Sequence, residues 1–230
     1  MPGSAAPADP GRIEAERVDP TLFTFAYESI APSGYMDQTL TIRSVAQVPV
    51  VLTAALTALD ADGVPMPGVT TGSVYGSHER RMVVLPGENI DVLRFDGESG
   101  GLTRDVRVDV TGVEPVDFPL VSGYVEVTPT DSSGTETDDP FEFTELVLDN
   151  SNAEPVTVRV VYLAWDAAGP GESQQVHDAV ELVPVTAVPA GAQTTVELPP
   201  ELLAEFQESG YGVGSYKAYY SVDPDGIVQG

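Results

Sequence analysis

Residues 35–63 read YMDQTLTIRSVAQVPVVLTAALTALDADG, and the pattern recurs without a gap at residues 141–169 as FEFTELVLDNSNAEPVTVRVVYLAWDAAG. In this alignment Pro49-Val50 falls on Pro155-Val156, and both copies close on a turn that begins with aspartate and ends with glycine. A repeated unit of about 100 residues is longer than a solenoid repeat and matches the size of one small β-sandwich. The repeat therefore predicts two related all-β domains in tandem.

The repeat also predicts where the chain divides. We expect an N-terminal arm at residues 1–20, a first β-sandwich at residues 21–113 and a second at residues 114–230. The linker, residues 111–118, contains Gly112 and Pro115. The arm is rich in proline, and such a segment is disordered on its own. We therefore expect a neighbouring subunit to order the arm.

Strand signals separated by turn residues run through both halves. One short helix is predicted at residues 201–209, because Pro199-Pro200 precedes it and Gly210 follows it. The predicted fold class is all-β, with two tandem β-sandwiches or jelly-roll-like barrels, short loops and at most one short helix. The strands are expected at residues 21–27, 38–45, 50–59, 81–85, 90–95 and 103–110, and then at 122–128, the repeated hairpin, 179–188, 194–198 and 215–222.

The charge balance limits the kinds of partner. The chain has 36 Asp and Glu residues against 10 Lys and Arg residues, a formal net charge of −26, and Lys217 is its only lysine. Phosphate binding needs clustered Lys and Arg, so we expect no contact with nucleic acid, and an anionic membrane would repel the chain.

Such acidity destabilises a fold by self-repulsion at low salt, whereas at about 1 M salt the Debye length falls to roughly 3 Å. High acidity and almost no lysine resemble the proteins of extreme halophiles. An acidic protein from a GC-rich mesophile is the alternative interpretation. For a halophilic protein we expect a fold or contacts that are weakened when the salt is lowered below about 1 M, whereas a melting temperature that does not change with salt would count against this assignment.

Several features bear on where the chain resides. Cysteine is absent, the N-terminal residues contain no apolar signal-peptide core, and no run of 18 apolar residues is present. Disulfides are typical of small secreted domains, but these domains are large enough to fold without them. We expect the chain to be made in the cytoplasm, not to leave by the ordinary secretory route, and not to insert into a membrane.

The two histidines are the first candidates for catalysis. His78 precedes Glu79, and His177 precedes Asp178. Neighbouring residues on a strand point to opposite faces, so such a pair does not form a catalytic triad. The chain also has no Gly-x-Ser-x-Gly motif and no cysteine nucleophile. We predict that both histidines are surface residues.

Three groups of carboxylates have the oxygen chemistry that Ca²⁺ prefers, at residues 60–63, 131–139 and 223–226. None has the EF-hand spacing, and Asp-x-Gly is an ordinary end for a hairpin turn. The loop at residues 131–139 is expected to be a solvated edge. We therefore assign no catalytic, cofactor-binding or metal-binding residue.

The aromatic residues indicate packing. Trp165 is the only tryptophan and lies in a predicted strand, so we expect it in the core. Alternation places Tyr216 and Tyr220 on one face of the last strand and Tyr219 on the other. One of these faces should be core, and the other is available to an interface, where tyrosine is enriched.

Tandem β-barrels without disulfides and with an N-terminal arm are typical of capsid subunits. The length, the acidity and the two small sandwiches resemble the major capsid proteins of haloarchaeal icosahedral viruses that have an internal membrane. The resemblance implies a vertical β-barrel of the shell at residues 35–110 and a second barrel, an outward tower, at residues 124–222. It also implies a virion structural protein without enzymatic activity, made in the host cytoplasm, whose partners are copies of itself and other virion proteins.

Decoration, turret and fibre proteins of tailed haloviruses would show the same features. Two interpretations from other functional classes stay open. One is a tandem immunoglobulin-like module for binding or adhesion at a cell surface, which would need a signal sequence or an anchor. The other is a hydrolase with a β-sandwich accessory domain, which would need a nucleophile or an acid pair brought together by the fold.

Overall fold

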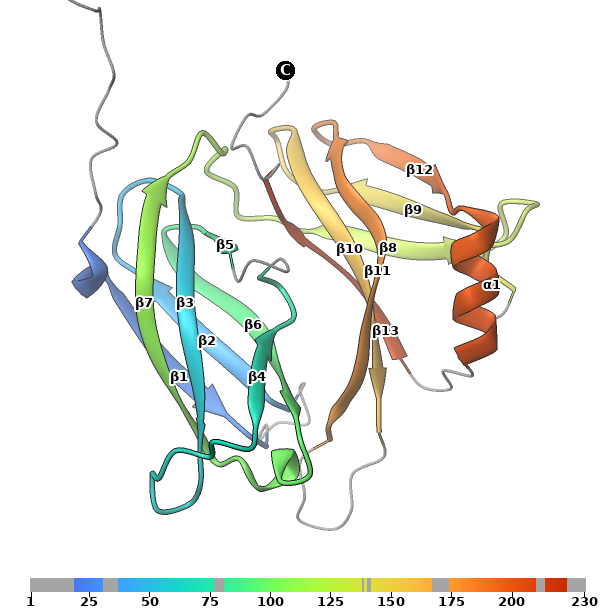
Figure 1. Ribbon diagram of the computed structural model, residues 1–230. Coiled ribbons are helices and arrows are strands. Elements are labelled where there is room, and N and C mark those ends of the chain that lie inside the picture. The colour runs from blue at the N-terminus through green and yellow to red at the C-terminus, as the bar shows by residue number, and fades with distance from the viewer. Residues whose placement is uncertain are drawn as a thin grey trace, which may run out of the picture.

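The computed structural model describes residues 19–30, 37–76, 81–137, 139, 142–166, 174–209 and 214–222. Within these residues the chain forms four antiparallel sheets, two 3-10 turns and one α-helix (Figure 1). The all-β class and the single short helix are therefore confirmed. The elements are η1 (Pro20–Leu22), β1 (Phe23–Glu28), β2 (Thr39–Ser44), β3 (Val50–Leu59), β4 (Thr70–Ser73), β5 (Arg81–Val84), β6 (Gly87–Asp96), η2 (Gly100–Leu102), β7 (Asp105–Pro115), β8 (Val125–Thr130), β9 (Glu145–Asn150), β10 (Val156–Trp165), β11 (Val176–Val188), β12 (Gln193–Glu197), α1 (Pro200–Ser209) and β13 (Gly214–Tyr220).

The first half of the chain is a sandwich of two sheets. One sheet has the strand order β1-β2-β6-β4 and the other has the order β5-β3-β7. Alternating apolar residues place a buried row on the inner face of each strand, as in Leu40 and Ile42 of β2. These rows meet in one hydrophobic cluster, to which Phe23, Leu52 and Phe95 also belong.

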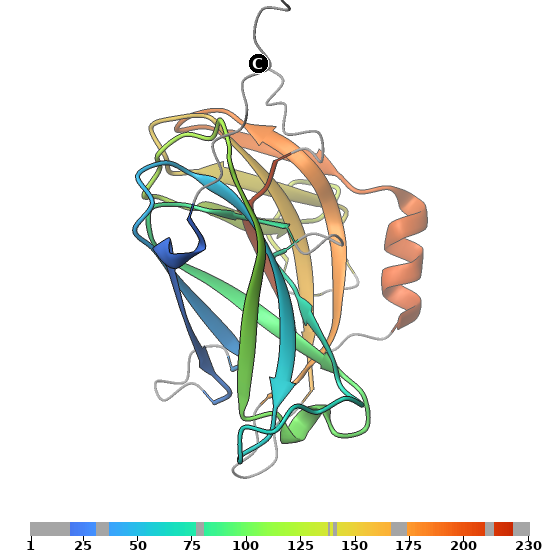
Figure 2. The same cartoon turned by 60° about the vertical axis from the view of Figure 1, so that its left-hand side comes forward.

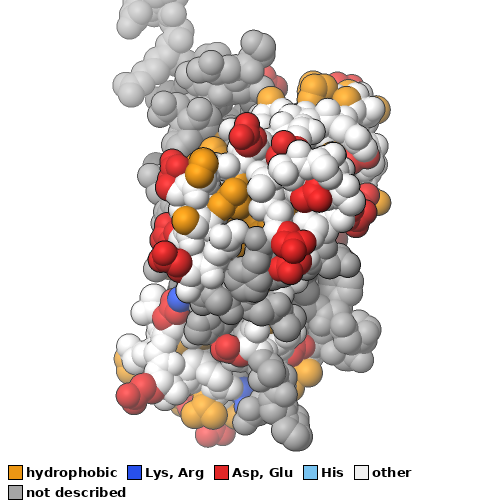
Figure 3. Space-filling view, turned by 90° about the vertical axis from the view of Figure 1, so that its right-hand side faces the viewer, with side chains coloured by type: hydrophobic (Ala, Val, Ile, Leu, Met, Phe, Trp, Pro, Cys, Tyr) orange, Lys and Arg blue, Asp and Glu red, His pale blue; other side chains and the backbone are white. Residues whose placement is uncertain are grey.

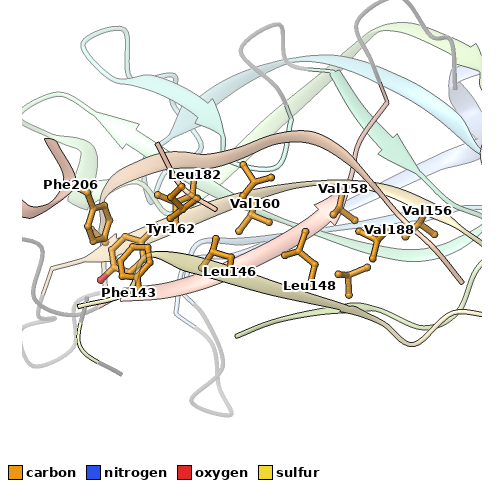
Figure 4. Close-up of a cluster of buried hydrophobic side chains, with 14 of the residues drawn as sticks. Phe143, Leu146, Leu148, Val156, Val158, Val160, Tyr162, Leu182, Val188 and Phe206 are labelled. Atoms are coloured by element: carbon orange, nitrogen blue, oxygen red, sulfur yellow. The ribbon is translucent and has the colours of Figure 1, made fainter. Parts of the chain in front are cut away.

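The second half is built in the same way, from a sheet of order β12-β9-β8 and a sheet of order β11-β10-β13. Its core contains Leu146 and Leu148 of β9 and Val158 and Val160 of β10, which face one another in Figure 4. Helix α1 closes one end of this core, because Phe206 inserts between aromatic rings. Its ring centroid lies 4.8 Å from that of Tyr162 and 5.4 Å from that of Phe143.

The sequence repeat is also a structural repeat. The repeated residues form β2 and β3 in the first copy and β9 and β10 in the second, with bounds that coincide in the alignment. β3 lies between β5 and β7 as β10 lies between β11 and β13, and β2 lies between β1 and β6 as β9 lies between β8 and β12. The same strand order in both halves follows from the same buried positions.

The sheets do not close into barrels, so the jelly-roll-like barrels predicted from the sequence are not confirmed. Each sheet ends in edge strands: among the described residues, β7 pairs with β3 and β13 with β10, and neither has a second partner. The short strand β4 and the turn η2 were not predicted. The division of the chain near residue 113 stays a prediction, since Val83 and Leu85 of the first half pack against the second core. Of the N-terminal arm, only Asp19 and Pro20 lie within the described residues.

Candidate functional site

The two halves meet across a third hydrophobic cluster. β10 is buried on both faces. On one face, Val158, Val160 and Tyr162 point into the core of the second half. Its other face, with Val161 and Leu163, packs against the first half (Figures 1 and 2). This junction cluster also contains Val74, Val92 and Val176, with Tyr75, Trp165, Ala179 and Tyr219 packed against it.

A buried arginine stands at the centre of the junction. Arg159 lies on β10, and only 7 % of its side chain is exposed. It donates hydrogen bonds to the Glu181 carboxylate of β11 at 3.0 Å and to the main-chain oxygens of Val74 at 3.1 Å and Tyr75 at 3.0 Å. Its guanidinium also lies 5.0 Å from the centre of the Tyr219 ring. Arg159 therefore joins the second half to the first through its hydrogen bonds to the Val74 and Tyr75 oxygens, while its ion pair with Glu181 lies within the second half.

A buried carboxylate holds the same segment from the opposite side. Asp91 of β6 is only 1 % exposed. It accepts hydrogen bonds from the Ser73 hydroxyl at 2.5 Å and from the Tyr75 main-chain N–H at 2.9 Å. Residues 73–76 comprise the last residue of β4 and the three residues that follow it. This segment is thus held between Asp91 of the first half and Arg159 of the second.

Burial in the junction shifts the pKa values of Asp91 and Tyr219. Burial raises the pKa of Asp91 to about 6, although the hydrogen bonds from Ser73 and Tyr75 and the charge of Arg159 act in the opposite direction. Burial likewise raises the pKa of the Tyr219 hydroxyl above its ordinary value, and this hydroxyl donates a hydrogen bond to the Val74 oxygen at 2.9 Å. Both groups are therefore neutral in weakly acidic solution.

Polar contacts at the rim of the junction complete the attachment. Arg94 of β6 forms an ion pair of 3.0 Å with Asp178 of β11. Gln38, which is buried and has a positive φ of 58°, accepts a hydrogen bond of 3.2 Å from the Val176 N–H. The Asp37 carboxylate accepts another from the Gln174 N–H at 2.6 Å.

The duplicated strands differ most on the face that forms the junction. Val161 and Leu163 of β10 align with Ala55 and Thr57 of β3, and Arg159 aligns with Thr53. Those three positions of β3 are only partly buried. The second copy therefore carries large apolar side chains and a cation where its outer face is covered, and the first copy carries small or polar ones.

A cleft of about 410 Å³ lies beside the junction. It is lined by the β5–β6 hairpin, by residues 121–123 and by three tyrosines, Tyr75, Tyr219 and Tyr220. Two of the tyrosine hydroxyls are engaged in the fold: that of Tyr219 as described above, and that of Tyr220 by donating to the Gly123 oxygen at 2.8 Å. The lining of the cleft therefore combines tyrosine side chains with polar residues such as Glu88, Asn89 and Ser122.

The aromatic predictions have mixed outcomes. Tyr216 and Tyr220 pack against the core of the second half and Tyr219 packs at the junction, so the predicted alternation is confirmed. The interface that Tyr219 serves lies within the chain. Trp165 packs against the junction cluster but is only partly buried, so its expected place in a core is confirmed only in part.

Two of the carboxylate groups form turns. The Asp60 carboxylate accepts hydrogen bonds from the main-chain N–H groups of Asp62 and Val64, each at 2.9 Å. The Asp131 carboxylate accepts the equivalent bonds from Ser133 at 2.8 Å and Thr135 at 3.0 Å, and its hydrogen bonds lower its pKa. Both turns have a glycine at positive φ three residues after the aspartate. Their carboxylates therefore cap main-chain groups.

The other candidates lie beyond the described residues. His78 and residues 223–226 are outside them, and His177 is in β11 but its side chain is not described. Within the part of the chain that the structure describes, no three His, Asp or Glu side chains are grouped closely enough to hold a metal ion.

The outer face of the sheet β12-β9-β8 carries like charges in register. Glu145 lies directly opposite Glu197, and Glu126 lies directly opposite Asp149. Like charges in such positions destabilise a sheet. Figure 3 shows acidic side chains spread over the side of the molecule that carries α1, with few basic ones. Salt that screens these pairs should therefore stabilise the second half.

Replacing Glu145 with glutamine should raise the melting temperature at low salt, by the equivalent of about 0.5 kcal/mol, because it removes one like-charge pair. The gain should shrink at about 1 M salt, where the repulsion is already screened. Thermal unfolding followed by circular dichroism at both salt concentrations measures this difference. The control is Glu88→Gln, because Glu88 lies opposite Arg43 and pairs with it at 3.1 Å. A gain for Glu145→Gln that does not change with salt would contradict the interpretation.

Arg159 and Asp91 were not singled out from the sequence. The available signal was a charged residue inside an otherwise apolar strand, Arg159 within VTVRVVYLAW. A charge in such a run is buried on one face or the other and needs a partner. Asp91 gives a weaker signal, because β6 alternates and carries other polar residues.

Comparison with protein families, with curated proteins and with solved structures finds no match to this chain. Among the described residues, none of the helices has the length and apolar character needed to cross a membrane.

Proposed function

We propose that this chain is a structural subunit of the virion of a halophilic virus, a capsid or capsid-decorating protein that packs against copies of itself and other virion proteins. The observation that carries the proposal is the junction. The hydrogen bonds of the buried Arg159 to the Val74 and Tyr75 oxygens, the Arg94–Asp178 ion pair and the apolar junction cluster hold the two sandwiches together, which supports one rigid block with a constant surface. A shell is built by repeating such a block.

The edge strands of the sheets support the same function. β7 is eleven residues long and pairs along one side with β3. Where β1 does not flank it, such an edge offers main-chain groups to another chain. In the finer form of the proposal, residues 21–113 and 114–230 are two domains related to small capsid barrels. β1 lies beside β7 and β8 beside β13, at the edges where a barrel would close.

The net charge of the chain supports a protein that works at high salt concentration. The described arginines that form ion pairs include Arg43, Arg81, Arg94 and Arg107, yet acidic residues outnumber the cations of the whole chain 36 to 10. Most carboxylates are thus left for solvent and counterions. A particle made of many such subunits would need molar salt to hold together.

The topology favours one alternative, a tandem immunoglobulin-like binding module. β1, β2 and β6 share one sheet, and β3 and β7 share the other, as strands A, B, E and C, F do in an immunoglobulin sandwich. The second half repeats this order. Such a module would act as a monomer that binds a partner through its loops or sheet edges.

Assembly distinguishes the two functions. The full chain and a variant lacking residues 1–18, which keeps Asp19 as the cap of η1, are compared by sedimentation velocity at about 1 M salt and above. We expect the full chain to form ordered oligomers and the truncated chain to stay monomeric, with the same circular dichroism spectrum. A full chain that is monomeric at all concentrations would favour the binding module. Normal assembly of the truncated chain would contradict the role of the arm.

A further inference from the structure

Among the residues that the structure describes, no cation forms an ion pair or a hydrogen bond with Asp91. Arg159, a buried cation of the junction, forms its ion pair with Glu181, and no ion pair joins it to Asp91. The donors to the Asp91 carboxylate are neutral, the Ser73 hydroxyl and the Tyr75 N–H. A carboxylate buried with neutral donors alone is more stable when it carries a proton.

The Ser73 hydroxyl is placed to bind either form of the acid. Its oxygen lies 2.5 Å from one Asp91 oxygen and accepts a hydrogen bond of 2.6 Å from the Gly76 N–H. When Asp91 is protonated, its O–H donates to Ser73; when Asp91 is ionised, Ser73 donates to it. The hydrogen bond survives in both forms, but the ionised form places an unpaired charge in the junction.

The groups that face Asp91 come from both halves. β10 contributes Arg159, whose charge favours the ionised form, and Glu181 of β11 lies beyond it. β13 contributes Tyr219, which is neutral and stacks on Tyr75 with ring centroids 4.3 Å apart. Neither tyrosine provides a charge. The charge of this contact therefore changes when Asp91 gains or loses its proton.

We propose that the junction is a proton-stabilised latch: uptake of one proton by Asp91 tightens the contact between the two halves, and loss of that proton loosens it. The latch acts through residues 73–76, which Asp91 holds from one side and Arg159 from the other. It is a property of the single chain and goes beyond the proposed assembly function.

The direction of the effect follows from the pKa of Asp91, which is raised from its ordinary 3.8 to about 6 in the junction. Below pH of about 4 the group is protonated whether the junction is closed or open, so its contribution to the closed form is complete. As the pH rises through 6, the closed form must give up its proton and the contribution is lost. The junction is therefore firmest in acid and weakest in neutral or alkaline solution.

Trp165 reports on the latch directly, because it is the only tryptophan and packs against the junction cluster. Its fluorescence is recorded from pH 4 to pH 8 at about 1 M salt, which screens the surface carboxylates. We expect a transition with a midpoint near pH 6 in the natural chain. In Asp91→Asn, which keeps the shape of the side chain without the titration, the transition should be absent. The control Asp149→Asn, on the outer face of the sheet β12-β9-β8, should keep it.

A second variant tests the latch even if Asp91→Asn does not fold. Ser73→Ala removes a hydrogen bond that lowers the pKa of Asp91, so the midpoint should move to higher pH by roughly one unit. A natural chain without a fluorescence transition near pH 6 would overturn the proposal. The same transition in Asp91→Asn, or a midpoint unmoved in Ser73→Ala, would do so as well.

Discussion

Replacing Arg159 with alanine is expected to lower the free energy of unfolding by about 3 kcal/mol. The substitution removes three hydrogen bonds of 3.0 to 3.1 Å, two of which join β10 to the Val74 and Tyr75 oxygens of the first half. Glu181 is 35 % exposed, so water can solvate its charge and the loss stays below that of a fully buried ion pair. Chemical denaturation at about 1 M salt measures the change.

The matched control for this variant is Arg43→Ala. Arg43 also forms an ion pair with a glutamate of a neighbouring strand, at 3.1 Å, but its side chain is 70 % exposed. Exposed pairs contribute about 0 to 1 kcal/mol, so this variant should unfold almost as the natural chain does. Equal losses for the two variants would mean that Arg159 does not hold the halves together.

Replacing Gly214 with alanine should have a comparable effect, a loss of about 3 kcal/mol, by overpacking. A Cβ atom at position 214 would lie 2.0 Å from the Cζ atom of Tyr162 and 2.1 Å from its hydroxyl oxygen. Tyr162 cannot swing aside, because its ring is packed against Phe206 at 4.8 Å and Tyr216 at 5.1 Å. β13 or the aromatic cluster must therefore move.

A strand glycine with room around it provides the control. At Gly72 of β4, the nearest atom to a new Cβ is the Arg94 oxygen at 4.0 Å, so Gly72→Ala should be neutral or slightly stabilising. A double-mutant cycle identifies the cause of the loss at Gly214. In a Tyr162→Ala background, Gly214→Ala should cost little, since the clashing ring is gone. An equally large cost in that background would show that the ring is not responsible.

The parts of the fold that depend on local pattern could be predicted from the sequence. The repeat of residues 35–63 identified the strands β2, β3, β9 and β10, because buried positions recur with a period of two in both copies. α1 was predicted within one residue because proline precedes it and glycine follows it. The face of each tyrosine in β13 followed from alternation alone.

The parts that depend on how distant segments pack could not be predicted. Whether two sheets close into barrels is decided by pairing between the first and last strands of each half, and no local signal specifies it. Trp165 was expected in a core, but its face of β10 is covered by the other half of the chain. The same packing buries Arg159, which one sequence alone cannot pair with the Val74 and Tyr75 oxygens.

The carboxylate clusters show a different limit of the sequence: it suggested a possible function where the structure shows a structural role. Asp60 and Asp131 drew attention as possible cation ligands, yet each caps main-chain groups of a turn. Short Asp-x-x-Gly sequences are consistent with both roles. What separates them is whether the carboxylate oxygens point at the main chain of the turn, and only the folded structure shows this.

The claim on which the proposed function rests is that the two sandwiches form one rigid block. Differential scanning calorimetry of the natural chain at about 1 M salt, near pH 5, tests it most directly. We expect a single unfolding transition whose calorimetric and van't Hoff enthalpies agree, at about 150 kcal/mol for a chain of this length. Two separate transitions, each with about half of that enthalpy, would contradict it, because the sandwiches would then unfold independently.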